Sequence, residues 1–116
     1  MRALTTFDAV YLHREAVDMR KSLDGLSGIV RNGLEMVLDQ RYLFVFVGRG
    51  RDRVKLLYWD RTGYALWYKR LERSRFPWPK DGENVIQISG DLFSYLLEGV
   101  DVFMRPHEDV TVAQNW

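Results

Sequence analysis

Residues 42–71 read YLFVFVGRGRDRVKLLYWDRTGYALWYKRL, and this stretch decides the fold. Residues 42–47 are apolar without interruption, which is typical of a strand that is buried on both faces, so we expect it in the centre of a sheet. Residues 53–59 and 64–71 are two further strand patterns, and short glycine-containing turns separate the three. Three consecutive strands joined by short turns predict an antiparallel β-meander.

Shorter patterns flank the meander on both sides. Residues 10–12 and 85–88 each predict a short strand. Apolar residues at steps of three and four predict a helix over about residues 22–32, where Gly25 and Gly28 suggest that another element packs closely. A second helix over about residues 90–98 follows Ser89, a good N-cap, and ends before Gly99.

These elements predict an α+β protein. We expect residues 1–116 to form a single domain, with an antiparallel sheet built on the meander and both helices packed on one face. The ordered core is expected over about residues 10–101. Residues 102–116 lack a sustained period and predict a loosely ordered tail.

The composition bounds the protein class. At 116 residues the chain can bury a hydrophobic core without disulfides, and it contains no cysteine. Its first residues lack the apolar run of a signal peptide, and no stretch approaches the roughly 20 apolar residues of a membrane span. We therefore expect a cytoplasmic protein without a membrane partner.

Positive charge is concentrated in one third of the chain. Residues 41–80 hold eleven basic and three acidic residues, a net charge of +8, whereas the six basic and thirteen acidic residues elsewhere give −7. Ten of the sixteen aromatic residues lie in the same segment. Arginine binds phosphate through two parallel hydrogen bonds and aromatic rings can stack on bases, so this composition favours nucleic-acid binding. The alternative is that these residues only form the solvated face of a sheet.

The candidate nucleic-acid-binding residues follow from this segment. Alternation places Trp59 on the face of Arg53 and Lys55, and Trp67 on the face of Lys69, which makes these two tryptophans the better stacking candidates. The glycine-flanked arginines suggest a flexible hairpin tip that reaches a nucleic-acid backbone. The predicted set comprises Arg49, Arg51, Arg53, Lys55, Trp59, Trp67, Lys69, Arg70, Arg73 and Arg75.

Catalytic and metal-binding patterns are not recognisable in the sequence. His13 and His107 are far apart and neither has a metal-ligand spacing. Residues 48–53 lack the Gly-Lys-Ser/Thr ending of a phosphate-binding loop, and a strand pattern rather than a helix follows them. We predict a protein that is not an enzyme and that has no cofactor, no metal and no small-molecule substrate.

Three blocks of the sequence resemble a known family. They are residues 17–26 (VDMRKSLDGL), residues 43–79 with the string WYKRLERSRFPWP at their end, and residues 96–101 (LLEGVD). Together they resemble the TnpB-type accessory protein, the second open reading frame product, of the IS-sixty-six insertion sequences. The chain departs from the family at residues 34–40, which look helical here where the family has a proline-containing linker.

The resemblance implies a small bacterial protein that is encoded beside a separate transposase and assists DNA transposition. It implies no catalytic residues. We therefore predict an accessory factor that contacts DNA through the 41–80 surface with little base specificity, and that works with the transposase of the same element. The alternative is a protein-interaction module that docks the transposase without touching DNA. For the first function, replacing Arg49, Arg51 and Arg53 with alanine should abolish DNA binding without unfolding the protein.

Overall fold

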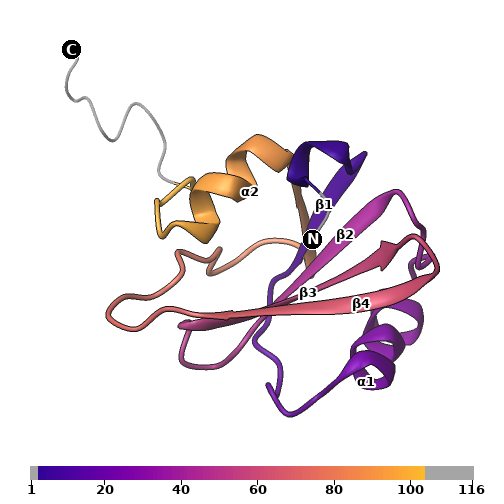
Figure 1. The fold of residues 1–116 in the computed structure, drawn as a ribbon. Coiled ribbons are helices and arrows are strands. Elements are labelled where there is room, and N and C mark those ends of the chain that lie inside the picture. Colours follow the sequence, from indigo (N-terminus) through magenta and orange to yellow (C-terminus); the bar gives the residue numbers. More distant parts are fainter. Residues whose placement is uncertain (1–2, 104–116) are drawn as a thin grey trace.

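The computed structural model describes residues 3–103, which form a five-stranded sheet between two helices (Figure 1). The strands are β1 (Ala9–His13), β2 (Tyr42–Val47), β3 (Arg53–Asp60), β4 (Gly63–Arg70) and β5 (Val85–Ile88). The helical segments are the 3-10 turn η1 (Leu4–Thr6), α1 (Leu23–Gly28), the π-helical turn η2 (Ile29–Gly33) and α2 (Gly90–Leu97). Each predicted strand and helix is present within a residue or two of its expected bounds, and the α+β class is confirmed.

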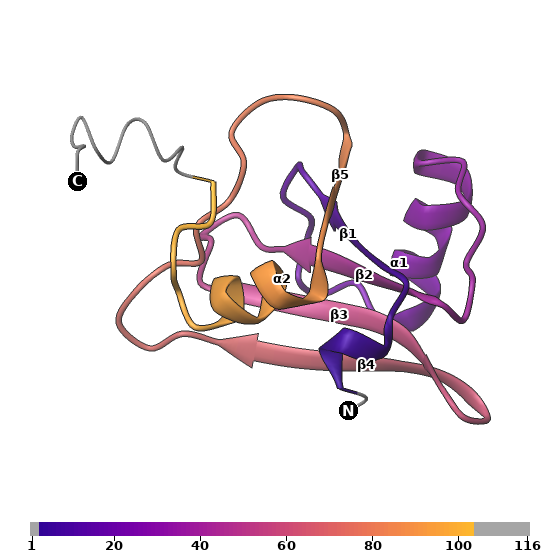
Figure 2. The ribbon, with the colours of Figure 1, turned by 90° about the horizontal axis from the view of Figure 1, so that it is seen from above.

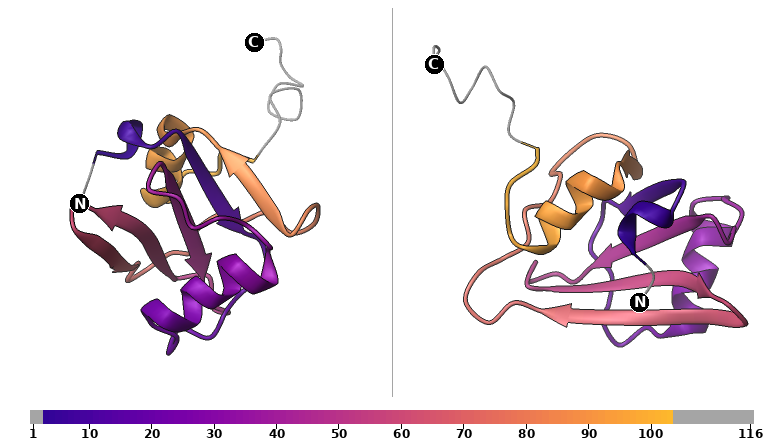
Figure 3. Two further views of the ribbon diagram at one scale, coloured as in Figure 1. Left: turned by 90° about the vertical axis from the view of Figure 1, so that its right-hand side faces the viewer. Right: turned by 45° about the horizontal axis from the view of Figure 1, so that its top comes forward.

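The sheet is mixed rather than wholly antiparallel. Its strand order is β4-β3-β2-β1-β5, so that β4 and β5 form its two edges (Figures 2 and 3). The predicted meander of β2, β3 and β4 is antiparallel, but β1 pairs in parallel with β2, with Val10 opposite Leu43. Parallel neighbours need a crossover connection, and residues 14–41 supply it by carrying α1 across the sheet.

The two helices cover opposite faces of the sheet, so the expectation that both pack on one face is wrong (Figure 1). The physical reason lies in β2, whose two faces are both apolar and must both be removed from water. On one face α1 and η2 pack against β2 and β3 through Leu26, Val30, Phe44, Phe46 and Leu57. On the other face α2 packs against β1, β2 and β3 in a cluster that includes Val10, Leu43, Val45, Leu56, Phe93 and Leu96.

Two connecting segments are irregular: residues 34–40, before β2, and the segment that follows β4. Residues 34–40 are irregular, so the helical expectation for them is wrong. Helix is interrupted there because Glu35 has a φ of 55°, in the left-handed region. The segment that follows β4 is irregular too, yet it buries Phe76 and Trp78 in the α2-side core. The indole Nε1 of Trp78 donates a 2.9 Å hydrogen bond to the carbonyl oxygen of Arg14 and thereby ties this segment to the end of β1.

Gly25 and Gly28 do not mark a close approach between elements, whereas Gly90 does. A Cβ on Gly28 would meet no atom within 4 Å, and one on Gly25 would meet only the side chain of Lys21. A Cβ on Gly90 would lie 2.6 Å from the carbonyl oxygen of Leu4 in η1. The absence of a side chain at Gly90 therefore allows η1 to pack on the start of α2.

Replacing Gly90 with alanine is expected to lower the free energy of unfolding by about 1–3 kcal/mol, because the new methyl group must displace backbone. Gly28→Ala is the matched control: Gly28 has helical dihedral angles and open space around it, so alanine there should stabilise the protein by about 0.4–1 kcal/mol. Urea denaturation of both variants measures the difference. Equal midpoints would contradict the close approach of η1 to α2.

The predicted tail lies almost wholly outside the described residues, as does His107. Within the described part of the chain, no helix is long and apolar enough to cross a membrane.

Candidate nucleic-acid interface

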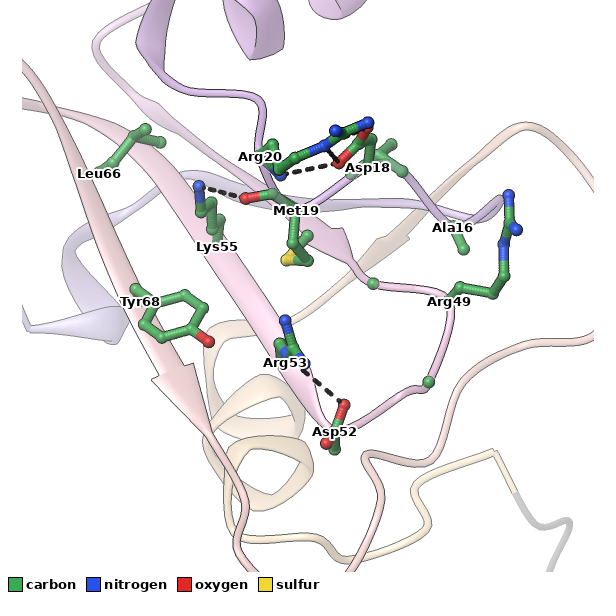
Figure 4. Close-up of a pocket in the computed structure, with 13 residues that line it drawn as sticks. Ala16, Asp18, Met19, Arg20, Arg49, Asp52, Arg53, Lys55, Leu66 and Tyr68 are labelled. Carbon is green, nitrogen blue, oxygen red and sulfur yellow. Dashed lines mark hydrogen bonds and ion pairs between the residues drawn. The ribbon is translucent and has the colours of Figure 1, made fainter.

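An open hollow of about 1040 Å³ lies on the α1 face, at the end of the sheet where β2 ends and β3 begins (Figure 4). Three parts of the chain line it: residues 16–20 from the crossover, residues of the β2–β3 turn, and the adjacent surface of β3 and β4. Its basic members are Arg20, Arg49, Arg53 and Lys55, and its acidic members are Asp18 and Asp52. We call this feature the basic hollow.

Backbone contacts hold the crossover segment against the β2–β3 turn. The N–H of Val17 donates a 2.9 Å hydrogen bond to the carbonyl oxygen of Val47, and Val17 forms a parallel bridge with Gly48. A Cβ on Gly48 would lie 2.7 Å from Cγ of Met19, so only glycine leaves room for the methionine there. The side of the hollow is therefore built by tertiary contacts between segments about thirty residues apart in sequence.

Lys55 anchors the same segment to the sheet. Its Nζ donates hydrogen bonds of 2.8 and 2.7 Å to the carbonyl oxygens of Met19 and Lys21. These bonds use two of the three donors of the ammonium group. Lys55 thus contributes positive charge to the hollow while it also positions the residues that form its side.

Arg20 is an exposed cation of the hollow. Its Nε and Nη2 donate hydrogen bonds of 2.7–3.1 Å to the Asp18 carboxylate, which lower the pKa of Asp18 well below its usual range. Asp18 is therefore ionised at neutral pH and fixes the orientation of Arg20. The Arg20 side chain is nevertheless 92% exposed, and its Nη1 makes no hydrogen bond to the described residues, so it remains able to donate to an incoming anion.

Arg49 and Arg53 complete the positive charge. Arg49 is exposed in the turn, where no described carboxylate lies within ion-pairing distance of it. Arg53 contacts Asp52 only at 3.8 Å, and its side chain is 48% exposed. With four basic and two acidic side chains the hollow carries a net charge of +2. This arrangement can bind a phosphate group through several guanidinium groups at once.

The structure separates Trp67 and Lys69 from the other predicted binding residues. The β3–β4 register places Arg53 opposite Arg70 and Lys55 opposite Tyr68 on the α1 face. Trp67 and Lys69 point to the α2 face, where Trp67 packs against the core. Lys69 donates a 3.1 Å hydrogen bond to the Leu97 carbonyl oxygen and pairs with Glu98 at 3.6 Å, which fits a role in fixing the end of α2.

Trp59 lies on the α1 face, as alternation predicts, but at the opposite end of β3 from the hollow. Its ring packs edge-on against Tyr64, with ring centroids 5.0 Å apart and an interplanar angle of 79°. Trp59 does not line the hollow.

Arg51 supports the turn rather than lining the hollow. Its φ of 64° lies in the left-handed region, and its carbonyl oxygen accepts a 2.6 Å hydrogen bond from the N–H of Phe76. Its side chain is half-buried, and the Nη1 atom is buried without a hydrogen-bond partner among the described residues. The predicted Arg49, Arg51 and Arg53 triple substitution would therefore disturb the packing of the turn as well as remove charge.

Three further predicted arginines lie near the basic hollow. Arg70 is on the same face at the end of β4, where it pairs with Glu72 at 3.3 Å. Arg73 and Arg75 are exposed in the segment after β4, which hydrogen bonds through Leu71 and Phe76 to the β2–β3 turn. These three arginines extend the positive surface beyond the hollow at the same end of the sheet.

Sequence reasoning missed Arg20 and Tyr68. Arg20 lies outside the basic 41–80 segment and reaches the hollow only because the crossover returns to the β2–β3 turn. Tyr68 lies in that segment, but only tryptophans were considered as stacking candidates there. The register that sets Tyr68 opposite Lys55 could have identified it.

The described residues contain no group of three or more histidine, cysteine, aspartate or glutamate side chains that could hold a metal ion. The acidic members of the hollow are also engaged with neighbouring arginines rather than directed at a common point.

Comparison with known proteins places the chain among relatives of similar length. The family model described as IS66 Orf2 like protein matches residues 8–106. Two proteins of Sinorhizobium fredii are similar: uncharacterized protein y4hO is 37% identical over 99 residues, covering 85% of each chain, and uncharacterized protein y4jC is 33% identical over 90 residues, covering 75% of this chain and 74% of the relative. No solved structure was found to match.

Proposed function

Because this chain belongs to the family of IS66 Orf2-like proteins, we propose that it is a non-enzymatic accessory factor for DNA transposition that contacts DNA directly. Membership of the family gives the association with transposition. The basic hollow carries the proposal of DNA contact, since cations from three separate parts of the chain converge there.

The charge geometry supports contact with a phosphate backbone. Arg20, Arg49 and Arg53 are exposed and come from the crossover, the turn and β3. Phosphate contacts of this kind orient a protein on DNA without reading its sequence. Within residues 3–103 no helix lines the hollow in a position to enter a major groove, so we expect binding that depends little on base sequence.

The transposase of the same element is the protein partner that this function requires. An accessory factor without catalytic residues acts by positioning DNA or the enzyme that cuts it. If DNA binding fails, docking of the transposase without DNA contact becomes the favoured function.

Fluorescence anisotropy tests the proposal with a labelled duplex from the terminal repeat of the element and a scrambled duplex of equal length. The logarithm of the binding constant should fall linearly with the logarithm of the salt concentration. Each neutralised phosphate releases counterions and contributes about −0.9 to the slope. We expect a slope of about −3 or steeper and similar affinities for the two duplexes. Absence of binding to either duplex at low salt would reject DNA contact.

A further inference from the structure

Tyr68 is an aromatic side chain at the basic hollow that the fold itself does not use. We propose that the hollow takes an unpaired nucleotide of a DNA strand, whose base stacks on Tyr68 while the flanking phosphates contact Arg49 and Arg53. This inference rests on the proposed function and names the form of DNA that the hollow recognises.

The ring of Tyr68 is accessible to a ligand. Tyr68 is 49% exposed, and its side chain makes no ring contact and no hydrogen bond with the described residues. The other aromatic residues on this face are in contact with one another or buried. Tyr11, Tyr42 and Phe44 pack together, Phe46 is buried, and Trp59 packs on Tyr64. A large ring left in water at the edge of a cationic hollow is available to a ligand (Figure 4).

Basic side chains of β3 lie next to Tyr68 on the same face of the sheet. Lys55 lies directly opposite Tyr68 on β3, and Arg53 lies two residues before Lys55 on the same face. Diagonal neighbours of this kind lie about 7–8 Å apart in an antiparallel pair, close enough for one nucleotide to touch both side chains. Because Lys55 is held by two carbonyl oxygens, Arg20, Arg49 and Arg53 are the cations of the hollow that remain to bind phosphate, and Arg53 is the one that lies diagonally opposite Tyr68.

The requirement for an unpaired base follows from the geometry of stacking. In a duplex both faces of each base are covered by neighbouring base pairs, so an aromatic side chain can stack only on a base that is unpaired or extruded. The hollow of about 1040 Å³ is comparable in size with the sites that hold small organic ligands, about 300–1,000 Å³, and it is bounded on one side by residues 16–20. This volume is large enough to accommodate one nucleotide.

The test compares a labelled twelve-nucleotide thymidine strand with its duplex, using the full chain at matched salt. We expect the strand to bind more tightly than the duplex. Tyr68→Ala should weaken binding of the strand about tenfold, the usual effect of removing one stacking ring, and should weaken duplex binding much less. Tyr68→Phe keeps the ring and should bind within about twofold of the wild type. Tyr95→Ala is the matched control, because Tyr95 is also exposed but lies on α2, on the opposite face.

The outcomes separate this inference from the proposed function. Equal strand affinity for wild type and Tyr68→Ala, with duplex binding intact, would overturn the inference and leave the proposed function standing. Absence of binding to both strand and duplex at low salt would overturn both. Binding of free thymidine monophosphate as tightly as the oligonucleotide would assign the hollow to a free nucleotide and overturn recognition of a strand.

Discussion

Replacing Arg20, Arg49 and Arg53 together with alanine is expected to weaken DNA binding at least about a hundredfold. Each arginine is exposed at the basic hollow and can donate charge-assisted hydrogen bonds, which contribute on the order of 1–3 kcal/mol each. Loss of three such contacts exceeds the roughly 2.7 kcal/mol that a hundredfold change represents. The salt dependence should become shallower by about three, one for each lost phosphate contact. Anisotropy titrations from low to physiological salt measure both quantities.

The control must remove the same charge from elsewhere. Arg31, Arg61 and Lys80 are exposed and lie outside the hollow, so their triple alanine variant has an equal change in net charge. It should lose only a few-fold in affinity. Equal losses in the two triple variants would mean that overall charge, rather than the hollow, governs binding. Arg51 is left unchanged in both variants because it supports the conformation of the β2–β3 turn.

Core substitutions on opposite faces of β2 should both be strongly destabilising. Phe46 lies in the cluster beneath α1 and Leu43 in the cluster beneath α2, and both are fully buried. Phe46→Ala should cost about 3–5 kcal/mol and Leu43→Ala about 2–5 kcal/mol, since each removes apolar contacts and leaves a cavity. Each value is a large fraction of the 5–15 kcal/mol that is typical of the whole stability of a domain.

Chemical denaturation of the two variants, with Val37→Ala as the control, measures these losses. Val37 is 74% exposed, so its truncation should change stability by less than about 0.5 kcal/mol. A near-neutral effect of either core substitution would contradict the burial of both faces of β2. It would instead support a fold with both helices on a single face.

The sequence predicted the basic residues of the hollow only in part. Arg49, Arg53 and Lys55 were recognisable because charge is concentrated in residues 41–80. Alternation also placed Trp59 with Arg53, and Trp67 with Lys69, correctly. It could not say that the face of Trp67 and Lys69 would be covered by α2, because alternation within a strand gives relative orientation and no information on which face a distant helix occupies.

The sequence by itself determined the elements, the antiparallel meander and the central position of β2, because these follow from local hydrophobic period, turn residues and an apolar run without interruption. The tertiary structure decided the parallel pairing of β1, the opposite placement of the helices and the membership of the basic hollow. Arg20 lines the same hollow as Arg49 and Arg53 only because the crossover after β1 is hydrogen bonded to the β2–β3 turn. These features depend on contacts between residues that are distant in sequence. The arrangement as a whole is favoured because it removes both apolar faces of the sheet from water at once.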